Sequence, residues 1–220
     1  MAETATSAVD WRAITADTIV ITHYTQFVRP LRQLGVSPRD SNDFTPYNAG
    51  MEPDTFSFLA DGQRYLVDPE GHAMRLTAAQ TLQRFALSLD TGMHVERLGF
   101  TRVQGDPVFL YQQTDNEGAS GFVARFDAIT LHPKWAVRVP GFNVGFALVD
   151  GADLYVTCIG FVGKLDLFTG KYSWRHDNLY QTEGFNDFGR PRLIGDTVEV
   201  PANGRRLFVA DRGTGRRIGR

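Results

Sequence analysis

Cysteine is almost absent from this chain, because Cys158 is the only one among its 220 residues. A single cysteine excludes an internal disulfide and any zinc or iron–sulfur site that needs several thiolates. Cys158 lies in the apolar stretch Leu154–Ile159, so we expect a buried thiol that packs in the core. The five histidines show no ligand spacing such as His-x-x-x-His, and we therefore expect no bound metal.

Long apolar runs are also missing. No run approaches the roughly 18 residues of a membrane span, and residues 1–8 contain no basic stretch followed by an apolar one. These absences predict a soluble chain that does not insert into a membrane. A small, polar start is also typical of a mature secreted protein, so the sequence leaves both the cytoplasm and the periplasm open as locations.

Common enzyme and nucleotide signatures do not occur. The hydrolase motif Gly-x-Ser-x-Gly is absent, and Gly213-Thr-Gly215 falls in a predicted turn and not before a helix, which argues against a phosphate-binding loop. The net charge of −2 gives no general attraction to nucleic acid. Arginines gather near the C-terminus, but alternation along a strand divides them between two faces, so we expect a solvated surface there and no nucleic-acid site. They are Arg205, Arg206, Arg212, Arg216, Arg217 and Arg220.

Four stretches of eleven residues, in contrast, align with one another without a gap. They begin at Arg75, Arg125, Lys164 and Val209, at intervals of 50, 39 and 45 residues. Intervals of this length are typical of four-stranded propeller blades, in which each unit buries its apolar face by stacking on its neighbours. The chain is therefore predicted to be a repeat array.

Strand and turn signals divide each repeat into four short strands. The clearest unit is residues 145–177, and the same order recurs in residues 100–139, 55–89 and 192–220. Helix propensity is highest in residues 78–89, but alignment with the other repeats favours a strand there. We predict an all-β fold in which residues 1–220 form a single small β-propeller of about five four-stranded blades. The N-terminal strands within residues 11–24 would close the ring and so remove exposed sheet edges.

The unit Lys164–Trp174 resembles the repeat of the pyrroloquinoline-quinone-like β-propellers, the superfamily that includes the quinoprotein alcohol dehydrogenases. The resemblance implies that Asp166 bonds backbone amides across the turn, that Gly170 takes a positive φ, and that the ring of Trp174 docks against the neighbouring blade. The other copies keep less of this motif. Asp127 and Trp135 persist in the second copy, Thr77 and Phe85 replace them in the first, and Gly219 replaces the tryptophan in the last.

The resemblance extends to the fold and not to the chemistry. The quinoprotein enzymes have a larger, eight-bladed ring with a disulfide of adjacent cysteines over the cofactor. This chain is too short for that ring and has one cysteine, so it is expected to bind no quinone and to have no cofactor of this type. We expect a degenerate, non-catalytic member of the superfamily.

Blade topology predicts that one face carries all the long connections, because alternate hairpins of a meander emerge on opposite faces. The predicted connections are residues 36–54, 90–98, 115–121 and 177–189, which together hold eleven acids and two arginines, a net charge of −9. Aromatic anchors in a charged rim suit protein recognition, although ordinary solvated loops are also polar. The candidate binding residues are Asp43, Phe44, Tyr47, Glu52, Asp115, Glu117, Asp177, Tyr180, Glu183, Phe185, Asp187 and Phe188.

Two hypotheses for function follow. The first is a non-catalytic propeller that binds a basic protein, for example an immunity protein that neutralises a cationic bacterial toxin through complementary charge. The second is a carbohydrate-binding or carbohydrate-active propeller of the cell envelope, which would use Asp43, Glu52 or Asp54 near the channel with aromatic rings as stacking platforms. The sequence leaves the oligomeric state open.

Overall fold

The computed structural model describes residues 56–60, 62–79, 81–115 and 118–219. Their strands form four antiparallel meanders, in which each strand pairs with the next along the chain. We number these sheets as blades 1 to 4. Blade 1 is β1 (Phe56–Ala60), β2 (Gln63–Val67), β3 (His72–Leu76) and β4 (Leu82–Ala86); blade 2 is β5 (His94–Val103), β6 (Asp106–Thr114), β7 (Ala119–Phe126) and β8 (Pro133–Val139); blade 3 is β9 (Phe142–Asp150), β10 (Asp153–Ile159), β11 (Phe161–Asp166) and β12 (Lys171–His176); blade 4 is β13 (Arg192–Ile194), β14 (Thr197–Ala202) and β15 (Arg206–Asp211).

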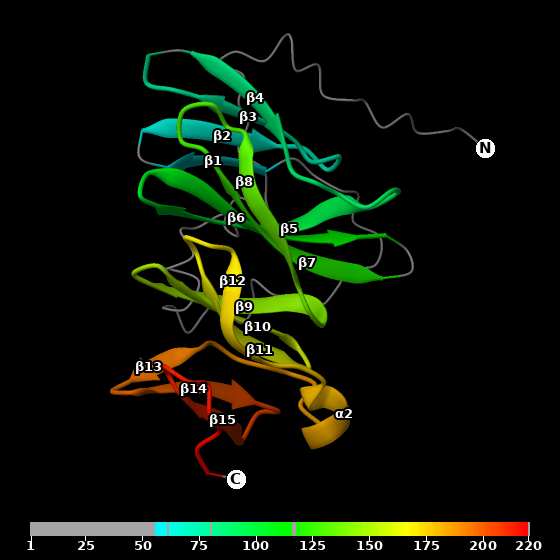
Figure 1. The fold of residues 1–220 in the computed structure, drawn as a ribbon. Coiled ribbons are helices and arrows are strands. Elements are labelled where there is room, and N and C mark those ends of the chain that lie inside the picture. The colour runs from blue at the N-terminus through cyan, green and yellow to red at the C-terminus, as the bar shows by residue number, and fades with distance from the viewer. Residues whose placement is uncertain (1–55, 61, 80, 116–117, 220) are drawn as a thin grey trace, which may run out of the picture.

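The blades stack in chain order, from blade 1 at the top of Figure 1 to blade 4 at the bottom. Hairpins that join the first to the second strand, or the third to the fourth, turn on one side of the stack, which we call the turn face. The other hairpins and the connections between blades lie on the opposite side, the loop face. The helix α2 (Leu179–Glu183) projects from the loop face between β12 and β13 (Figure 1). Nothing in the described residues has the length and hydropathy of a membrane-spanning helix.

The turn between the third and fourth strands repeats from blade to blade. The Oδ1 atoms of Asp127, Asp166 and Asp211 each accept a hydrogen bond from a backbone N–H two or three residues ahead, at 2.7–3.0 Å. Such side-chain bonds replace the backbone bonds that the turn leaves unmade. Gly170 closes its turn with a φ of 70°, and in blade 2 Leu131 takes the same role with a φ of 56°. The role of Asp166 and the positive φ of Gly170 are as predicted.

Tryptophan rings dock blade 2 on blade 3 and blade 3 on blade 4. The ring of Trp174 covers Gly215 of blade 4 so closely that a Cβ at Gly215 would lie 2.5 Å from the ring's Cγ, and its Nε1 donates to the carbonyl oxygen of Arg212 at 3.1 Å. Trp135 covers Gly170 of blade 3 in the same way and donates to the carbonyl oxygen of Phe168 at 3.3 Å. The docking role predicted for Trp174 is therefore confirmed.

The core consists of three clusters of buried side chains, one at each boundary between neighbouring blades. Aromatic rings dominate the first boundary, where the Tyr65 and Phe100 centroids lie 5.0 Å apart and those of Phe85 and Phe109 lie 5.5 Å apart. Phe85 thus fills the place that tryptophan takes in the next two blades. Aliphatic side chains form the second boundary, which also buries Cys158, as expected.

The all-β propeller architecture and the four blade repeats are as predicted. Residues 82–86 form β4, so the pattern shared by the repeats overrides the local helix propensity, as expected. Blade 4 has three strands, and its fourth is reduced to a single bridge between Ala210 and Arg217. Three glycines among residues 213–219 weaken a strand there. Residues 11–24, which are predicted to close the ring, lie outside the described residues.

Candidate functional site

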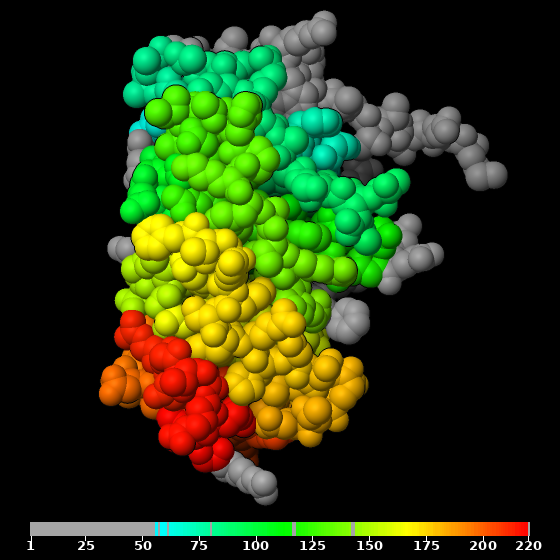
Figure 2. Space-filling view, viewed as in Figure 1, coloured from blue at the N-terminus to red at the C-terminus, as the bar shows by residue number. Residues whose placement is uncertain are grey.

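A groove of about 640 Å³ opens on the loop face between blades 2 and 3. Its walls come from the start of β7, the end of β8, the β8–β9 connection, the β10–β11 hairpin, β12 and the start of α2. Figure 2 shows α2 and the connection after it, in yellow to orange, projecting from the same side of the molecule as the green ends of blade 2. The groove is therefore built from the connections that a meander directs to this face.

Two features hold α2 at the edge of the groove. The backbone N–H of Leu179 donates to the carbonyl oxygen of Gly160 at 2.9 Å, and the Leu179 side chain is buried. Gly160 has a φ of 75°, and a Cβ there would lie 3.1 Å from the Cβ of Tyr180. Only glycine combines this φ with so close an approach. As a result Tyr180 packs its Cβ on the hairpin, while 54% of the residue stays exposed.

The floor of the groove is apolar and aromatic. Phe161 is fully buried and packs edge to face with Tyr172, with ring centroids 5.6 Å apart. The hydroxyl of Tyr172 donates to the carbonyl oxygen of Arg138 at 3.3 Å, which ties blade 3 to blade 2 below the groove. Burial raises the pKa of Tyr172 above its usual value, so this hydroxyl keeps its proton at neutral pH and acts as a donor.

Two guanidinium groups and one carboxylate supply the charge of the groove. Arg138 is exposed and forms no ion pair within the described part of the chain. The Nε of Arg175 lies 3.0 Å from Oδ2 of Asp177, and its guanidinium carbon lies 5.8 Å from the centre of the Tyr172 ring. Oδ1 of Asp177 is buried without a hydrogen-bond partner among the described residues. The groove therefore carries a net positive charge.

No catalytic set is visible among the described residues that line the groove. They include no serine, cysteine, histidine or lysine, and Asp177 is their only carboxylate. The described lining therefore contains neither a nucleophile with a neighbouring base nor the pair of carboxylates that glycoside hydrolysis requires. Cys158 lies in the core, and burial raises its pKa to about 12, so its thiol stays protonated and unreactive.

The candidate residues of the loop 177–189 fall into two groups. Asp177 and Tyr180 line the groove, as a binding role requires, and Asp187 is exposed beyond it. Phe185 and Phe188 are buried, with 1% and 5% exposed, and pack against each other at 5.4 Å in the boundary between blades 3 and 4. The prediction that they are surface anchors is therefore wrong, because the apolar rings that follow α2 fill the core under the loop.

The predicted surplus of acid on this loop is also reduced by neighbouring chain segments. Glu183 pairs with Arg217 at 3.0 Å, Asp177 pairs with Arg175, and Arg206 donates to the carbonyl oxygen of Glu183. The guanidinium of Arg206 also stacks on Phe185, with its central carbon 4.0 Å from the ring centre. These arginines belong to β12 and blade 4 and lie outside residues 177–189. Several arginines of the C-terminal cluster are therefore structural and not a free basic patch.

The remaining candidates lie elsewhere. Asp115 lies in the tight β6–β7 hairpin, where its Oδ1 accepts from the backbone N–H of Gly118 at 2.8 Å. The predicted connections 90–98 and 115–121 are shorter than expected, because β5 begins at His94 and β7 at Ala119. Residues that lie outside the described part of the chain are Asp43, Phe44, Tyr47, Glu52, Asp54 and Glu117.

Sequence reasoning missed Arg138 and Arg175, which neither a motif nor a predicted loop marks. Arg138 follows Trp135 by three residues, and Arg175 directly follows Trp174. Both therefore stand near the loop-face end of the fourth strand of their blade. Once each docking tryptophan is assigned to the fourth strand, the repeat alignment predicts that these two arginines lie near the loop face.

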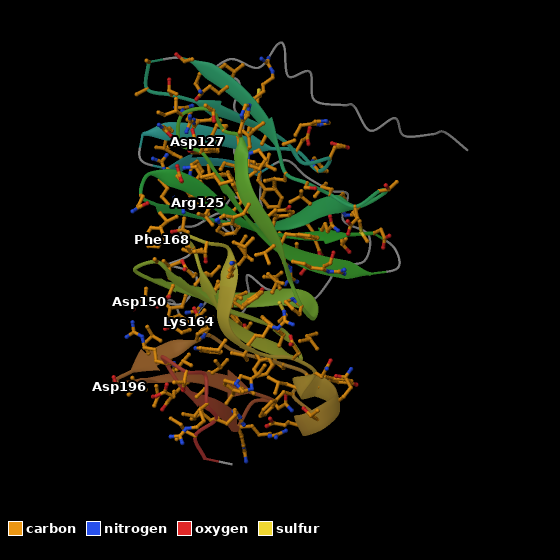
Figure 3. The ribbon with its side chains drawn as sticks, viewed as in Figure 1. Arg125, Asp127, Asp150, Lys164, Phe168 and Asp196 are labelled. Carbon is orange, nitrogen blue, oxygen red and sulfur yellow. The ribbon has the colours of Figure 1, made fainter. Side chains whose placement is uncertain are left out.

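A second charged cluster, on the turn face, has a structural role. Arg125 and Asp106 are both buried, and Arg125 Nη2 lies 2.6 Å from Asp106 Oδ2. Arg125 also donates to the carbonyl oxygens of Leu167 and Phe168 at 3.1 Å, and Figure 3 shows Arg125 and Phe168 close together across the boundary between blades 2 and 3. Burial alone would raise the pKa of Asp106, but hydrogen bonds from Lys134, Arg125 and a backbone N–H hold that pKa below its usual value. The cluster fastens two blades together.

Asp68, Glu70 and His72 place one potential metal-ligand atom each within 4.8 Å of one another in the β2–β3 hairpin. The carboxylate of Asp68 accepts from the backbone N–H of His72 at 2.8 Å, and its other oxygen lies 3.0 Å from His72 Nδ1. These contacts close the hairpin, which accounts for the proximity of the three side chains without a bound ion.

Comparison with known proteins supports the fold. No protein-family model matches the chain. No curated protein sequence matches it either. Among solved structures, a europium-containing methanol dehydrogenase aligns with 74% of this chain and 40% of its own, at 12% identity and a TM-score of 0.55. Quinohemoprotein alcohol dehydrogenases from Comamonas testosteroni (15% identity, 76% and 35% of the chains, TM-score 0.51) and Pseudomonas putida HK5 (14%, 74% and 33%, TM-score 0.51) align similarly.

Identities this low establish the fold alone, and this chain spans 33–40% of the length of those three proteins. The chain has the pyrroloquinoline-quinone-like β-propeller fold that the repeat Lys164–Trp174 predicts. The fold by itself does not specify a function, because binding and catalytic sites are formed by the loops that a scaffold carries.

Proposed function

We propose that this chain is a non-catalytic β-propeller that binds a protein partner on its loop face, in the groove between blades 2 and 3. The observation that supports the proposal best is the exposed ring of Tyr180 at the edge of an apolar groove of about 640 Å³. Tyrosine is enriched among the residues that contribute most to binding in protein interfaces, because its ring is apolar and its hydroxyl can form a hydrogen bond. The backbone and Cβ of Tyr180 pack closely on Gly160, which fixes the place from which the ring projects.

The absence of a nucleophile, a base or a carboxylate pair from the described lining supports binding over catalysis. The aligned dehydrogenases are enzymes, but the likeness to them is one of fold. A disulfide between adjacent cysteines, which covers the quinone in such enzymes, cannot form in a chain with one cysteine. The chain's role is accordingly proposed as recognition.

A basic partner, such as a cationic toxin held by an immunity protein, is the finer version of this proposal. Its support is the count of acids in the predicted loops, of which Asp187 and Asp90 are exposed in the structure. Because Asp177 and Glu183 are paired with arginines, Asp187 is the residue of this loop whose charge is available to a partner. Replacing Asp187 by Asn tests the charge of the partner without breaking an ion pair.

Carbohydrate binding is the alternative, and the groove offers one observation in its favour. Tyr180 is an exposed ring with the amides of Asn178 and Gln181 on either side in sequence, all lining the groove. An aromatic platform with amide groups near it suits a sugar ring, whose apolar face stacks while its hydroxyls form hydrogen bonds.

The test is a pull-down of partners from the source lysate with the full chain as bait. Tyr180→Ala is expected to weaken capture of the main protein partner by about 30-fold, as for the loss of a hot spot. The control is Ile129→Ala, which removes a side chain that is 79% exposed on the turn face, and this variant is expected to bind as the unchanged chain does. Equal capture by the two variants would show that the groove is not the interface. Binding of neutral glycans instead of protein would favour the carbohydrate alternative.

A further inference from the structure

The groove between blades 2 and 3 combines positive charge, an apolar floor and exposed side-chain amides. From this combination we propose that its occupant is an extended peptide segment of the partner, in which an acidic side chain follows an apolar one. The inference rests on the proposed function, since it names the chemistry of the partner's contact with that same groove. It predicts a partner whose overall charge is unrestricted but whose inserted segment is acidic.

The acidic side chain is inferred from the two guanidinium groups. Arg138 is exposed and has no ion pair within the described residues, while Arg175 uses its Nε for Asp177 and leaves its terminal nitrogens uncommitted to that carboxylate. A guanidinium presents its N–H groups in a fork that matches the two oxygens of a carboxylate. A cationic side chain in the same place would face both arginines, and like charges at close range are unfavourable.

The apolar neighbour is inferred from the floor. Its partly exposed side chains are Val137, Pro140, Ile159 and Tyr172, and Phe161 is fully buried among them. The exposed parts of these apolar side chains carry no charge, so an apolar residue of the segment would remove water from them without leaving a polar group unpaired. The adjacent Tyr180 ring would then cover the inserted residue from the α2 side.

The peptide backbone is inferred from the side-chain amides at the edge of the groove. Asn178 and Gln181 line it beside Tyr180, and both are exposed. A side-chain amide both donates and accepts hydrogen bonds, and an extended segment presents backbone N–H and C=O groups that pair with it. An inorganic anion carries no donor. The groove thus offers donors to a carboxylate and amide partners to a backbone, the two groups that an acidic peptide presents together.

The experiment titrates the ¹⁵N-labelled full chain with blocked hexapeptides and follows the amide signals by NMR. The probes are Gly-Ser-Phe-Glu-Ser-Gly and matched peptides with Gln or Lys in place of Glu. We expect the Glu peptide to shift the signals of Gly160 and Tyr180 and to bind about three- to five-fold more tightly than the Gln peptide, the upper part of the range for an exposed charge pair. The Lys peptide is expected to bind most weakly.

Two variants assign the effect to the groove. Arg138→Gln is expected to abolish the preference for Glu over Gln, whereas Arg205→Gln, which removes the same charge from an exposed residue of the β14–β15 hairpin, is expected to retain it. The proposal is overturned if the Glu and Gln peptides bind equally, if the Lys peptide binds best, if the shifts map outside the groove, or if no peptide shifts any signal at millimolar concentration. The pull-down with Tyr180→Ala tests the proposed function, and the peptide titration tests this inference. The titration can therefore fail while Tyr180→Ala still weakens capture of the protein partner, so the two failures are distinguishable.

Discussion

The docking of Trp174 on Gly215 can be tested by adding a single methyl group. Gly215→Ala places a Cβ 2.5 Å from Cγ and 2.7 Å from Cβ of Trp174, atoms close to the backbone that cannot move aside without shifting the ring. Gly215 also has a φ of 74°, which alanine adopts only under strain. Gly204→Ala is a matched control, because Gly204 has a φ of 73° and a Cβ there meets no atom within 4 Å.

The two variants should differ by the steric conflict alone. A positive φ at alanine is expected to lower the free energy of unfolding by about 1–2 kcal/mol in both variants. Overlap with the packed ring should lower it by about 1–3 kcal/mol more in Gly215→Ala. Trp174→Ala by itself should cost about 3–5 kcal/mol, because the residue is 8% exposed and donates to the carbonyl oxygen of Arg212.

The assay is equilibrium unfolding in urea for the two alanine variants, each made with Trp174 and with Trp174→Ala. Removing the ring should reduce the cost of Gly215→Ala to that of Gly204→Ala, and this non-additivity is the signature of direct contact. Equal midpoints for the two glycine variants in the presence of Trp174 would refute the docking geometry. So would a Trp174→Ala protein that melts at the same temperature as the unchanged chain.

Three further predictions follow from the fold and the buried polar groups. Far-ultraviolet circular dichroism should show a β-dominated spectrum, and a helical fraction above roughly a third would contradict the propeller. Cys158, whose pKa is raised to about 12 by burial, should resist alkylation by iodoacetamide at pH 8 and react fully once the chain is unfolded; rapid labelling of the folded chain would show that this boundary is open. The lowered pKa of Asp106 means that its ionised form is favoured by folding, so its contribution to stability is present above the unfolded pKa, near 4, and is lost as the pH falls through the lower folded value. Asp106→Asn should therefore unfold in a way that depends less on pH below about 4 than the unchanged chain does, and identical acid dependence would be the contrary result.

Repetition is the reason that the fold could be predicted from the sequence. The alignment of Lys164–Trp174 with the other copies assigned the third and fourth strands of each blade, and it overruled the helix propensity of residues 78–89. The contact that stacks the blades came from the resemblance of this unit to the pyrroloquinoline-quinone-like repeat, which implied the roles of Asp166, Gly170 and Trp174. Such consistency between local and repeated patterns is what makes a strand assignment secure.

The site was predicted only in part, because charge counted along a loop omits what folds against it. Topology correctly directed the connections to one face and so singled out Tyr180 and Asp177. It could not show that Phe185 and Phe188 turn inward, since an aromatic residue in a loop has no periodicity to assign its side. Nor could it show that Arg217, 34 residues after Glu183, would neutralise that acid.

The position of α2 would couple the proposed binding to the opening of blade 4. Blade 4 has three strands, packs on blade 3 among the described residues, and is joined to it by the segment that carries Tyr180. Its sheet is one strand smaller than that of blade 2, which packs on both blade 1 and blade 3, so amide exchange in β13–β15 should report a lower opening free energy than exchange in blade 2. A partner that clamps α2 to the β10–β11 hairpin would oppose this separation. Binding should then slow hydrogen exchange at amides of blade 4 that the partner does not contact.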